Sequence, residues 1–218
     1  MRRVGPGPPT ALRLVGSAVT GYVAGTLPSA AIAARLATGG RTDLRVTGSG
    51  NPGAANAMAV LGTGWGLGVL GADVAKAAVA CCTGRLLADG PGSHLAGVAA
   101  VAGHCFPWNA SFKGGKGVAA SAGQCLVTFP AYFPIDVAVA ALTGAVPAWR
   151  NRAFATTAVA SVTWVGAAFV WWRRGWPNLW GPRPSAGLPL AAAATSAMIG
   201  YRFASASGPT DRGRGVPR

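Results

Sequence analysis

Charged side chains are scarce in this sequence, and glutamate is absent from it altogether. Only 11% of the 218 residues are charged, whereas residues of the hydrophobic set make up 51%. In soluble domains about a quarter of the residues are charged, so this composition argues against a soluble protein. The length fits a single domain.

The few acidic residues are all aspartate, and basic residues therefore dominate the charge. Five Asp stand against 19 Lys and Arg, which gives a formal net charge of +14. Such a balance indicates nucleic acid, an anionic membrane surface or anionic substrates as partners. The basic residues lie in small groups between long charge-free stretches, with no basic amphipathic helix and no basic patch interleaved with aromatics. This distribution disfavours nucleic acid.

Cysteine is equally scarce and is not arranged for metal binding. The four cysteines are Cys81, Cys82, Cys105 and Cys125, and no two of them form a CxxC pair. Each lies in or beside a predicted apolar span, where a thiol ordinarily packs as a small apolar group. The sequence predicts neither a disulfide nor a metal site, and no cofactor.

Long stretches without charge predict membrane-spanning helices. A helix needs about 20 apolar residues to cross the hydrocarbon core, and a charge at its centre costs about 2.5 to 3.5 kcal/mol. Four ranges satisfy this condition: 14–34, 90–112, 153–172 and 184–201. A further span at 63–87 carries Asp73 and Lys76. These two residues project from the same helical face, where they can pair or face a polar cavity.

The range 117–149 is interpreted as two short helices. It holds one charge, Asp136, and prolines at 130, 134 and 147, so a turn near residues 130–134 fits better than one long helix. The chain is therefore predicted to be all-α, a polytopic membrane protein of about seven transmembrane helices. Residues 1–206 would form a single transmembrane domain, and residues 207–218, rich in Gly, Pro and Arg, a disordered basic tail.

Lys and Arg in the connecting segments indicate the orientation. Cytoplasmic loops carry an excess of these residues, and an N-terminus outside the cell places the larger number of them inside. Arg173 and Arg174 are exceptions, because this orientation leaves them outside. The loops at 41–56 and 103–117 are accordingly expected on the cytoplasmic side.

The first of these loops, RTDLRVTGSGNPGAAN, is rich in Gly, Ser and Asn. Its glycines let successive backbone N–H groups converge on one anion. Three side chains add neutral donors, so that phosphate can be bound without a metal: Ser49, Asn51 and Asn56. Gly48, Gly50 and Gly53 also satisfy GxGxxG, but no strand precedes them and a dinucleotide site is not predicted. The alternative is a flexible interhelical loop.

The second loop, GHCFPWNASFKGGKG, carries two lysines. Only Gly114 and Gly115 separate Lys113 from Lys116, so both ammonium groups can reach a common anion. The loop is not a Walker A motif, because Gly117 follows the second lysine. The alternative is ordinary positive charge at a helix end. His104 is a candidate proton shuttle or a hydrogen-bonded structural residue.

Together the two loops resemble a known family. The strings DLRVTGSGNPGAAN and GHCFPWNASFKGGKGVA closely resemble the first and second signature motifs of the bacterial acyl-phosphate:glycerol-3-phosphate acyltransferases. The motif spacing, the pair of Asp73 and Lys76 and the hydropathy match over most of the chain. The resemblance implies a seven-helix protein of the bacterial inner membrane with its N-terminus outside. It also implies synthesis of 1-acyl-glycerol 3-phosphate (lysophosphatidate) from acyl phosphate, an early step of phospholipid synthesis.

The resemblance also implies site residues. Ser49 and Lys116 would be catalytic and contact glycerol-3-phosphate, while Asn51 and the glycine backbone of the first loop cradle phosphate and Lys113 adds positive charge. The chemistry needs two anions oriented beside an apolar slot, and no Ser-His-Asp set. The implied substrate-binding residues are Arg45, Gly48, Gly50, Asn51, Gly53, Asn56, His104, Lys113, Gly114, Gly115 and Gly117. The expected partners are acyl phosphate, glycerol-3-phosphate and membrane lipids; the oligomeric state stays open, and a monomer is compatible.

The chain departs from the family pattern in two places. Ala59 stands where the family has an arginine, and only Tyr201 and Arg202 remain of the third motif. Three arginines are candidate replacements: Arg45, Arg202 and Arg212. These departures keep a non-catalytic or altered-acceptor relative open as an alternative. A small transporter is a weaker alternative, because the polar residues collect at one interface and no internal repeat is found.

Overall fold

Helices make up all the regular structure in the described part of the chain. The computed structural model describes residues 10–147 and 151–206, so the tail predicted at 207–218 lies outside the described residues. The helices are α1 (Ala11–Gly25), α2 (Ser29–Thr38), α3 (Ala54–Leu61), α4 (Thr63–Cys105), a short 3-10 helix (Trp108–Ala110), α5 (Val118–Thr128), α6 (Phe133–Gly144), α7 (Arg152–Arg174) and α8 (Gly187–Ala206). The all-α prediction is confirmed.

Helix α4 consists of two arms that fold back on each other. Ala88 and Asp89 have non-helical backbone angles, and Pro91 follows them. In a straight helix Gly84 and Gly92 would lie about 12 Å apart. Instead, a Cβ on either residue would collide with the backbone of the other. The break lies at the boundary predicted between the spans 63–87 and 90–112, although the second arm already ends at Cys105.

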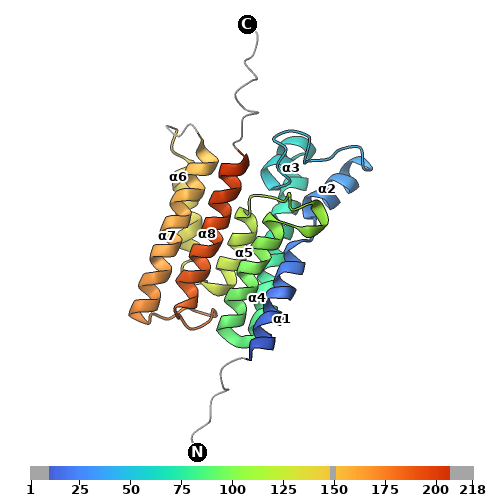
Figure 1. Cartoon of the computed structure of the whole chain (residues 1–218). Helices are drawn as coiled ribbons and strands as arrows, with labels where there is room; N and C mark the ends of the chain where they lie inside the picture. The colour runs from blue at the N-terminus through green and yellow to red at the C-terminus, as the bar shows by residue number, and fades with distance from the viewer. Residues whose placement is uncertain (1–9, 148–150, 207–218) are drawn as a thin grey trace, which may run out of the picture.

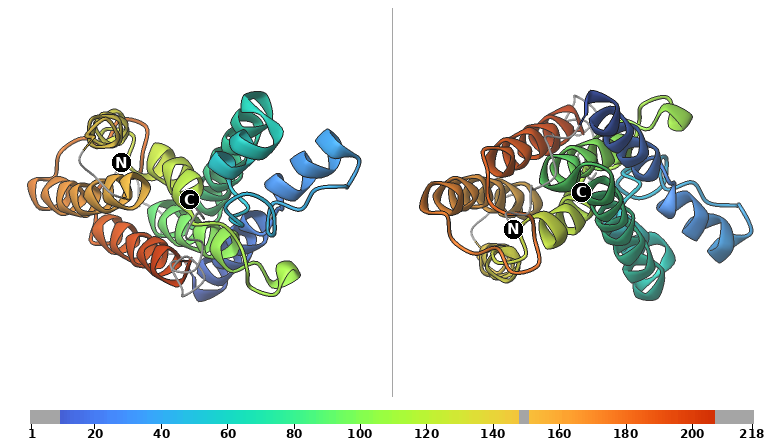
Figure 2. Two further views of the ribbon diagram at one scale, coloured as in Figure 1. Left: turned by 90° about the horizontal axis from the view of Figure 1, so that it is seen from above. Right: turned by 90° about the horizontal axis from the view of Figure 1, so that it is seen from below.

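Within residues 10–147 and 151–206, seven helical segments run between the two ends of the bundle: α1, the two arms of α4, and α5 to α8 (Figure 1). This arrangement confirms the predicted helix number. Helices α2 and α3 lie at the end where α8 terminates, opposite the start of α1. Seen along the bundle, α6, α7 and α8 occupy one side, and α1 to α3 the other, with α5 and the second arm of α4 between them (Figure 2).

The predicted helix at 14–34 is wrong in one respect, because the chain breaks after Gly25. Pro28 lacks the N–H that would continue the helical hydrogen bonds, and α2 begins only at Ser29. The carbonyl of Leu27, freed by this break, accepts a hydrogen bond of 3.0 Å from Lys76 Nζ. The turn predicted near residues 130–134 is confirmed, since α5 ends at Thr128 and α6 begins at Phe133.

Helix α1 packs closely on the second arm of α4 through small residues. A Cβ on Gly21 would collide with the backbone of Ala96, and one on Gly25 with that of Ala100. Close backbone approach of this kind is typical of helix pairs in membranes, where apolar burial adds little to association.

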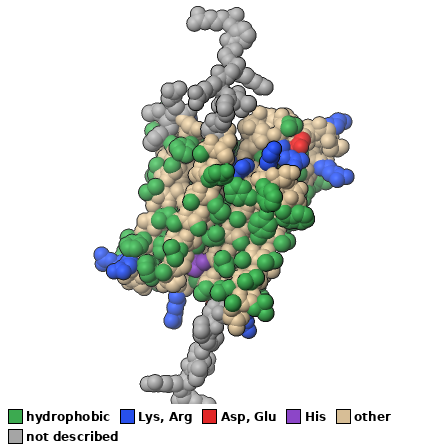
Figure 3. Space-filling view, in the orientation of Figure 1, with side chains coloured by type: hydrophobic (Ala, Val, Ile, Leu, Met, Phe, Trp, Pro, Cys, Tyr) green, Lys and Arg blue, Asp and Glu red, His purple; other side chains and the backbone are tan. Residues whose placement is uncertain are grey.

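The middle of the bundle presents an apolar surface, and basic side chains gather at its two ends (Figure 3). Val15, Val19 and Val23 of α1 are each more than half exposed. By length and composition, two described helical stretches are long and apolar enough to cross a membrane: Thr63–Ala110, which contains both arms of α4, and Arg152–Arg174. Helices α5 and α6 are apolar but shorter, with 11 and 12 residues. The surface and the helices together indicate a membrane protein.

Candidate active site

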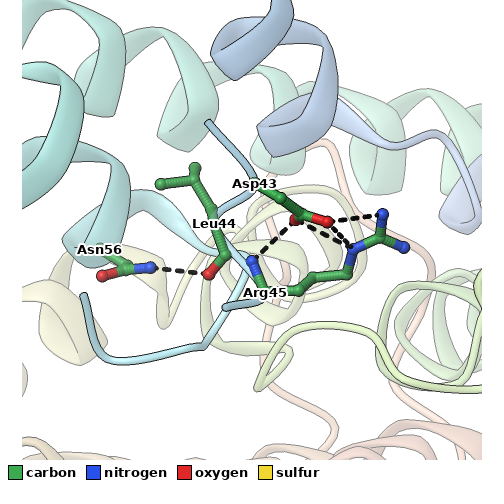
Figure 4. A network of polar contacts seen from close by, with 4 residues as sticks. All are labelled: Asp43, Leu44, Arg45 and Asn56. Atoms are coloured by element: carbon green, nitrogen blue, oxygen red, sulfur yellow. Dashed lines mark hydrogen bonds and ion pairs between the residues drawn. The ribbon is translucent and has the colours of Figure 1, made fainter. Parts of the chain in front are cut away.

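The first loop joins α2 to α3 and is held by the side chain of Asn56. This residue lies in the first turn of α3 rather than in the loop, because the helix already begins at Ala54. Its Oδ1 accepts a hydrogen bond of 2.9 Å from the Ser49 amide, and its Nδ2 donates to the carbonyls of Leu44 and Thr47, both at 3.0 Å. The bond to Leu44 is drawn in Figure 4. Asn56 therefore holds the loop in its conformation through these three hydrogen bonds.

Two turns of the loop require glycine. Gly48 and Gly50 have φ angles of +64° and +70°, in the left-handed region that other residues rarely adopt. A Cβ at Gly48 would also collide with Oδ1 of Asn56. Neither glycine is among the described residues that line the two cavities beside the loops. Their turns instead leave Ser49 exposed and Asn51 partly exposed.

Arg45 forms an ion pair within this loop. Its Nη2 lies 3.0 Å from Oδ2 of Asp43, and its Nε also donates to that carboxylate (Figure 4). The hydrogen bonds from Arg45 hold the pKa of Asp43 below its usual range. Both side chains are about half exposed, at 48% and 45%, so the pair contributes little to stability.

The glycines of the second loop fold back on the end of α4. The amides of Gly114 and Gly115 donate to the carbonyls of Cys105 and His104, each at 3.1 Å. Arg202 of α8 donates to the two glycine carbonyls, at 2.6 and 3.1 Å. A Cβ on Gly115 would collide with the imidazole of His104. The turn between the two lysines is thus fixed by its own backbone and by Arg202.

A buried polar network joins α4 to the break between α1 and α2. Lys76 Nζ lies 2.9 Å from Oδ1 of Asp73, so these residues pair, and both alternatives left open by the sequence hold because each residue also lines a cavity. The hydroxyl of Ser29 donates to the same oxygen at 2.5 Å. His104 Nδ1 lies 3.4 Å from it, longer than an ordinary hydrogen bond. Asp73 is 1% exposed and Lys76 8%, so both charges are almost fully removed from solvent.

Both loops line two cavities among the described residues, and the larger one has a volume of about 460 Å³. Both loops contribute to its lining although they lie far apart in the sequence. Its polar lining residues are Ser49, Asn51, Asn56, Asp73, His104, Lys116, Arg152, Thr156 and Thr157. Apolar and glycine residues form the rest, among them Leu70, Val118 and Phe203. The cavity therefore combines hydrogen-bond donors and positive charge with an apolar wall.

The smaller cavity has a volume of about 70 Å³. Arg45, Lys76 and Lys113 line it, together with Gly114 and Gly115. The structure thus places the two lysines of the second loop in different cavities, whereas their spacing suggested one common anion. His104 lines both cavities.

Lys116 is the partly buried cation of the larger cavity. Its Nζ lies 4.4 Å from the centroid of the Phe203 ring. Burial, and next the positive charge of Arg202, hold the pKa of Lys116 below its ordinary value. An anion bound nearby would offset both effects and favour the charged form.

A family model described as glycerol-3-phosphate acyltransferase matches residues 15–207. The chain belongs to this acyltransferase family. The match includes both loops and all helices of the bundle except the first four residues of α1, so the sequence resemblance is confirmed.

Curated relatives of the family resemble part of this chain. A glycerol-3-phosphate acyltransferase of Bacillus velezensis is 46% identical over 121 residues, and one of Bacillus subtilis is 43% identical over 121 residues. Each match covers 56% of this chain and 62% of the relative, less than two thirds of the relative's length.

The fold of the family is known from solved structures. A crystal structure of PlsY (YgiH), described as an integral membrane glycerol 3-phosphate acyltransferase in its glycerol 3-phosphate form, superposes with a TM-score of 0.70. The two chains are 25% identical, and the superposition covers 88% of each. A second PlsY structure, the lysophosphatidic acid form, has the same TM-score at 24% identity and supports the fold alone. The present chain has this all-helical membrane fold.

Several residues around the cavities were not predicted from the sequence. Ser29, Arg152 and Phe203 come from three different helices, and only the folded chain brings them to the loops. Of the candidate replacements for the missing arginine, Arg45 pairs with Asp43 and Arg202 binds loop carbonyls. Arg212 lies outside the described residues.

Proposed function

We propose that this protein transfers a fatty acyl group from acyl phosphate to glycerol-3-phosphate and forms lysophosphatidate. The observation that carries the proposal is the larger cavity, where Ser49 and Asn51 of one loop face Lys116 of the other beside an apolar wall. Two phosphorylated substrates, one with a hydrocarbon chain, need this combination of groups. Membership of the family supports the same reaction.

The reaction requires positioning more than it requires a catalytic base. A hydroxyl oxygen of glycerol-3-phosphate attacks the acyl carbonyl carbon, the bond from that carbon to the phosphate oxygen breaks, and inorganic phosphate leaves. The departing phosphate takes the hydroxyl proton. Acyl phosphate is a reactive anhydride, so neutralising and orienting the two anions supplies most of the acceleration.

The residues divide into binding and shaping roles. Ser49 and Lys116 contact glycerol-3-phosphate, and the side chain of Asn51 contacts phosphate oxygens. The amide of Gly53 donates to the Asn51 carbonyl at 2.8 Å, so Gly53 holds the turn that presents this side chain. Lys113 and Arg45 add positive charge at the smaller cavity. Gly48, Gly50 and Asn56 shape the first loop, while Gly114, Gly115 and Gly117 let the second loop approach α4. His104, which lines both cavities, orients the second loop through its contact with Gly115.

We further propose that the protein lies in the bacterial inner membrane with both loops on the cytoplasmic side. The loops lie at the same end of the bundle, opposite the start of α1 (Figure 1). With the N-terminus outside, this end faces the cytoplasm, where phosphorylated intermediates are made.

A second candidate is a non-catalytic or altered-acceptor relative that binds phosphorylated lipid precursors. It is favoured by one observation: Phe203, at the end of α8 where the third motif would continue, faces the larger cavity without offering a hydrogen bond to a substrate. The bound phosphate would be the same, but the hydroxyl acceptor would differ.

Acyl transfer by the purified protein in detergent separates these candidates. Labelled glycerol-3-phosphate is supplied with palmitoyl phosphate or, as a control, with palmitoyl-CoA, and lysophosphatidate is measured. The proposal predicts product with palmitoyl phosphate only. No product from folded protein that still binds glycerol-3-phosphate would favour the non-catalytic candidate.

A further inference from the structure

Arg152 lies at the beginning of α7 and lines the larger cavity, across from the first loop. Ala153, Thr156 and Thr157 line the same cavity, so the first two turns of α7 form one of its walls. Asn151 fixes the beginning of this helix, because its Oδ1 accepts a hydrogen bond of 3.1 Å from the Phe154 amide. The arginine is thus carried by a capped helix and not by a loose loop.

The charges around this cavity do not balance. Within the described lining, Asp73 is the one carboxylate, and it is already bound to Lys76 and Ser29. Lys116 and Arg152 form no ion pair with a described residue. Two cations in a cavity with no acidic partner of their own attract an anion of more than one negative charge.

We propose that Arg152 binds the phosphate group of a substrate in the larger cavity, together with Lys116. This inference deepens the proposed function and rests on it. A planar guanidinium offers two parallel N–H groups to two phosphate oxygens, which an ammonium cannot do. The ligand is a phosphate monoester or an acyl phosphate, and the two substrates are distinguished by experiment.

An arginine introduced at position 59 tests whether the larger cavity needs a positive charge, irrespective of the helix that carries it. Ala55 of α3 lines the same cavity, and Ala59 lies one turn further along the helix, exposed and uncharged. Side chains of a helix lean toward its N-terminus, so an arginine at 59 extends toward Ala55 and the cavity. Position 59 can therefore supply from α3 the charge that Arg152 supplies from α7.

The experiment compares kcat/KM of the full-length protein and its variants in detergent, with each substrate varied in turn. Arg152→Ala should lower kcat/KM by about 10- to 100-fold, mainly through a higher KM for the substrate whose phosphate is bound. Arg152→Lys should recover only part of this loss. Arg174→Ala is the matched control, because it removes the same side chain from the other end of α7 and should leave activity unchanged.

The double variant Arg152→Ala/Ala59→Arg separates binding from a structural role. If Arg152 contacts the phosphate, the arginine at position 59 should raise kcat/KM several-fold above that of Arg152→Ala. Ala59→Arg alone should raise kcat/KM little above that of the wild-type protein. Unchanged activity in Arg152→Ala, or a loss that Ala59→Arg does not reduce, would overturn the inference.

The inference can be tested even if the proposed function is wrong. If the wild-type protein transfers no acyl group, binding of glycerol-3-phosphate measured by calorimetry replaces the kinetic readout. Weaker binding in Arg152→Ala than in Arg174→Ala then supports the inference without the reaction, and equal binding overturns it.

Discussion

Lys116 is the side chain whose protonation state matters most at the site. Its ammonium binds phosphate below its pKa and loses this ability above it. Because burial and Arg202 lower that pKa, the charge is lost at a lower pH than for an exposed lysine. The site should therefore lose affinity for glycerol-3-phosphate as the pH rises through the lowered pKa.

This pH dependence can be measured against a matched variant. In Lys116→Arg the guanidinium stays charged to about pH 12, so the alkaline fall in kcat/KM should move to higher pH, whatever the loss in absolute rate. Spontaneous hydrolysis of acyl phosphate is subtracted with protein-free samples. An alkaline limb at the same pH in both proteins would assign the fall to another group.

The buried pair of Asp73 and Lys76 gives a prediction on stability. Asp73→Ala leaves an ammonium buried without its carboxylate, which should cost about 3 to 5 kcal/mol. The double variant Asp73→Ala/Lys76→Met removes both charges and should lose much less. Thermal unfolding in detergent compares the three proteins. A single variant as stable as the double one would show that the pair is not coupled in this way.

At the scale of residues, the sequence predicted which side chains line the site better than it predicted where they lie. Ser49, Asn51 and Lys116 were predicted from their loops, and all three line one cavity. The spacing of Lys113 and Lys116 could not show that the turn of Gly114 and Gly115 directs them into different cavities. That separation depends on hydrogen bonds to the end of α4 and to Arg202, which is distant in sequence.

At the scale of elements, the packing of α1 on α4 depends on the absence of side chains. Gly21→Ala should destabilise the protein by about 1 to 3 kcal/mol, because the added methyl group meets the backbone of Ala96. Gly16→Ala on the same helix is the control, since its Cβ would lie 3.9 Å from Leu87 and alanine favours the helix. Equal melting temperatures of the two variants would contradict the close packing.

Helix number and most helix boundaries followed from charge-free runs and prolines. The fold-back of α4 at Ala88 and Asp89 was predicted as a gap between two spans. The break after Gly25 was missed although Pro28 lies in this range, because residues 26–34 are as apolar as those before them and carry no charge. Its stabilisation comes from Lys76, which donates to the Leu27 carbonyl from another helix. The pattern of apolar residues within one segment cannot reveal a hydrogen-bond donor that comes from another helix.

At the scale of the whole molecule, the proposed orientation places the two ends of the seven-helix bundle on opposite sides of the membrane. A membrane-impermeant maleimide tests this orientation in intact cells, with single cysteines in a variant that lacks the native ones. Leu179→Cys, between α7 and α8, should react from outside, and Val46→Cys, in the first loop, only after permeabilisation. Both side chains are more than half exposed. The reverse pattern would place the loops outside.

The central claim is that two loops distant in sequence bind one substrate in one cavity. The most direct test is a double-mutant cycle on acyl transfer with Ser49→Ala and Lys116→Ala. Lys116→Ala should lower kcat/KM by roughly 10- to 150-fold and Ser49→Ala by roughly 2- to 13-fold. Because both residues contact the same substrate, the double variant should lose less than the product of the two effects. Losses that multiply, or a folded wild-type protein without activity, would contradict the account.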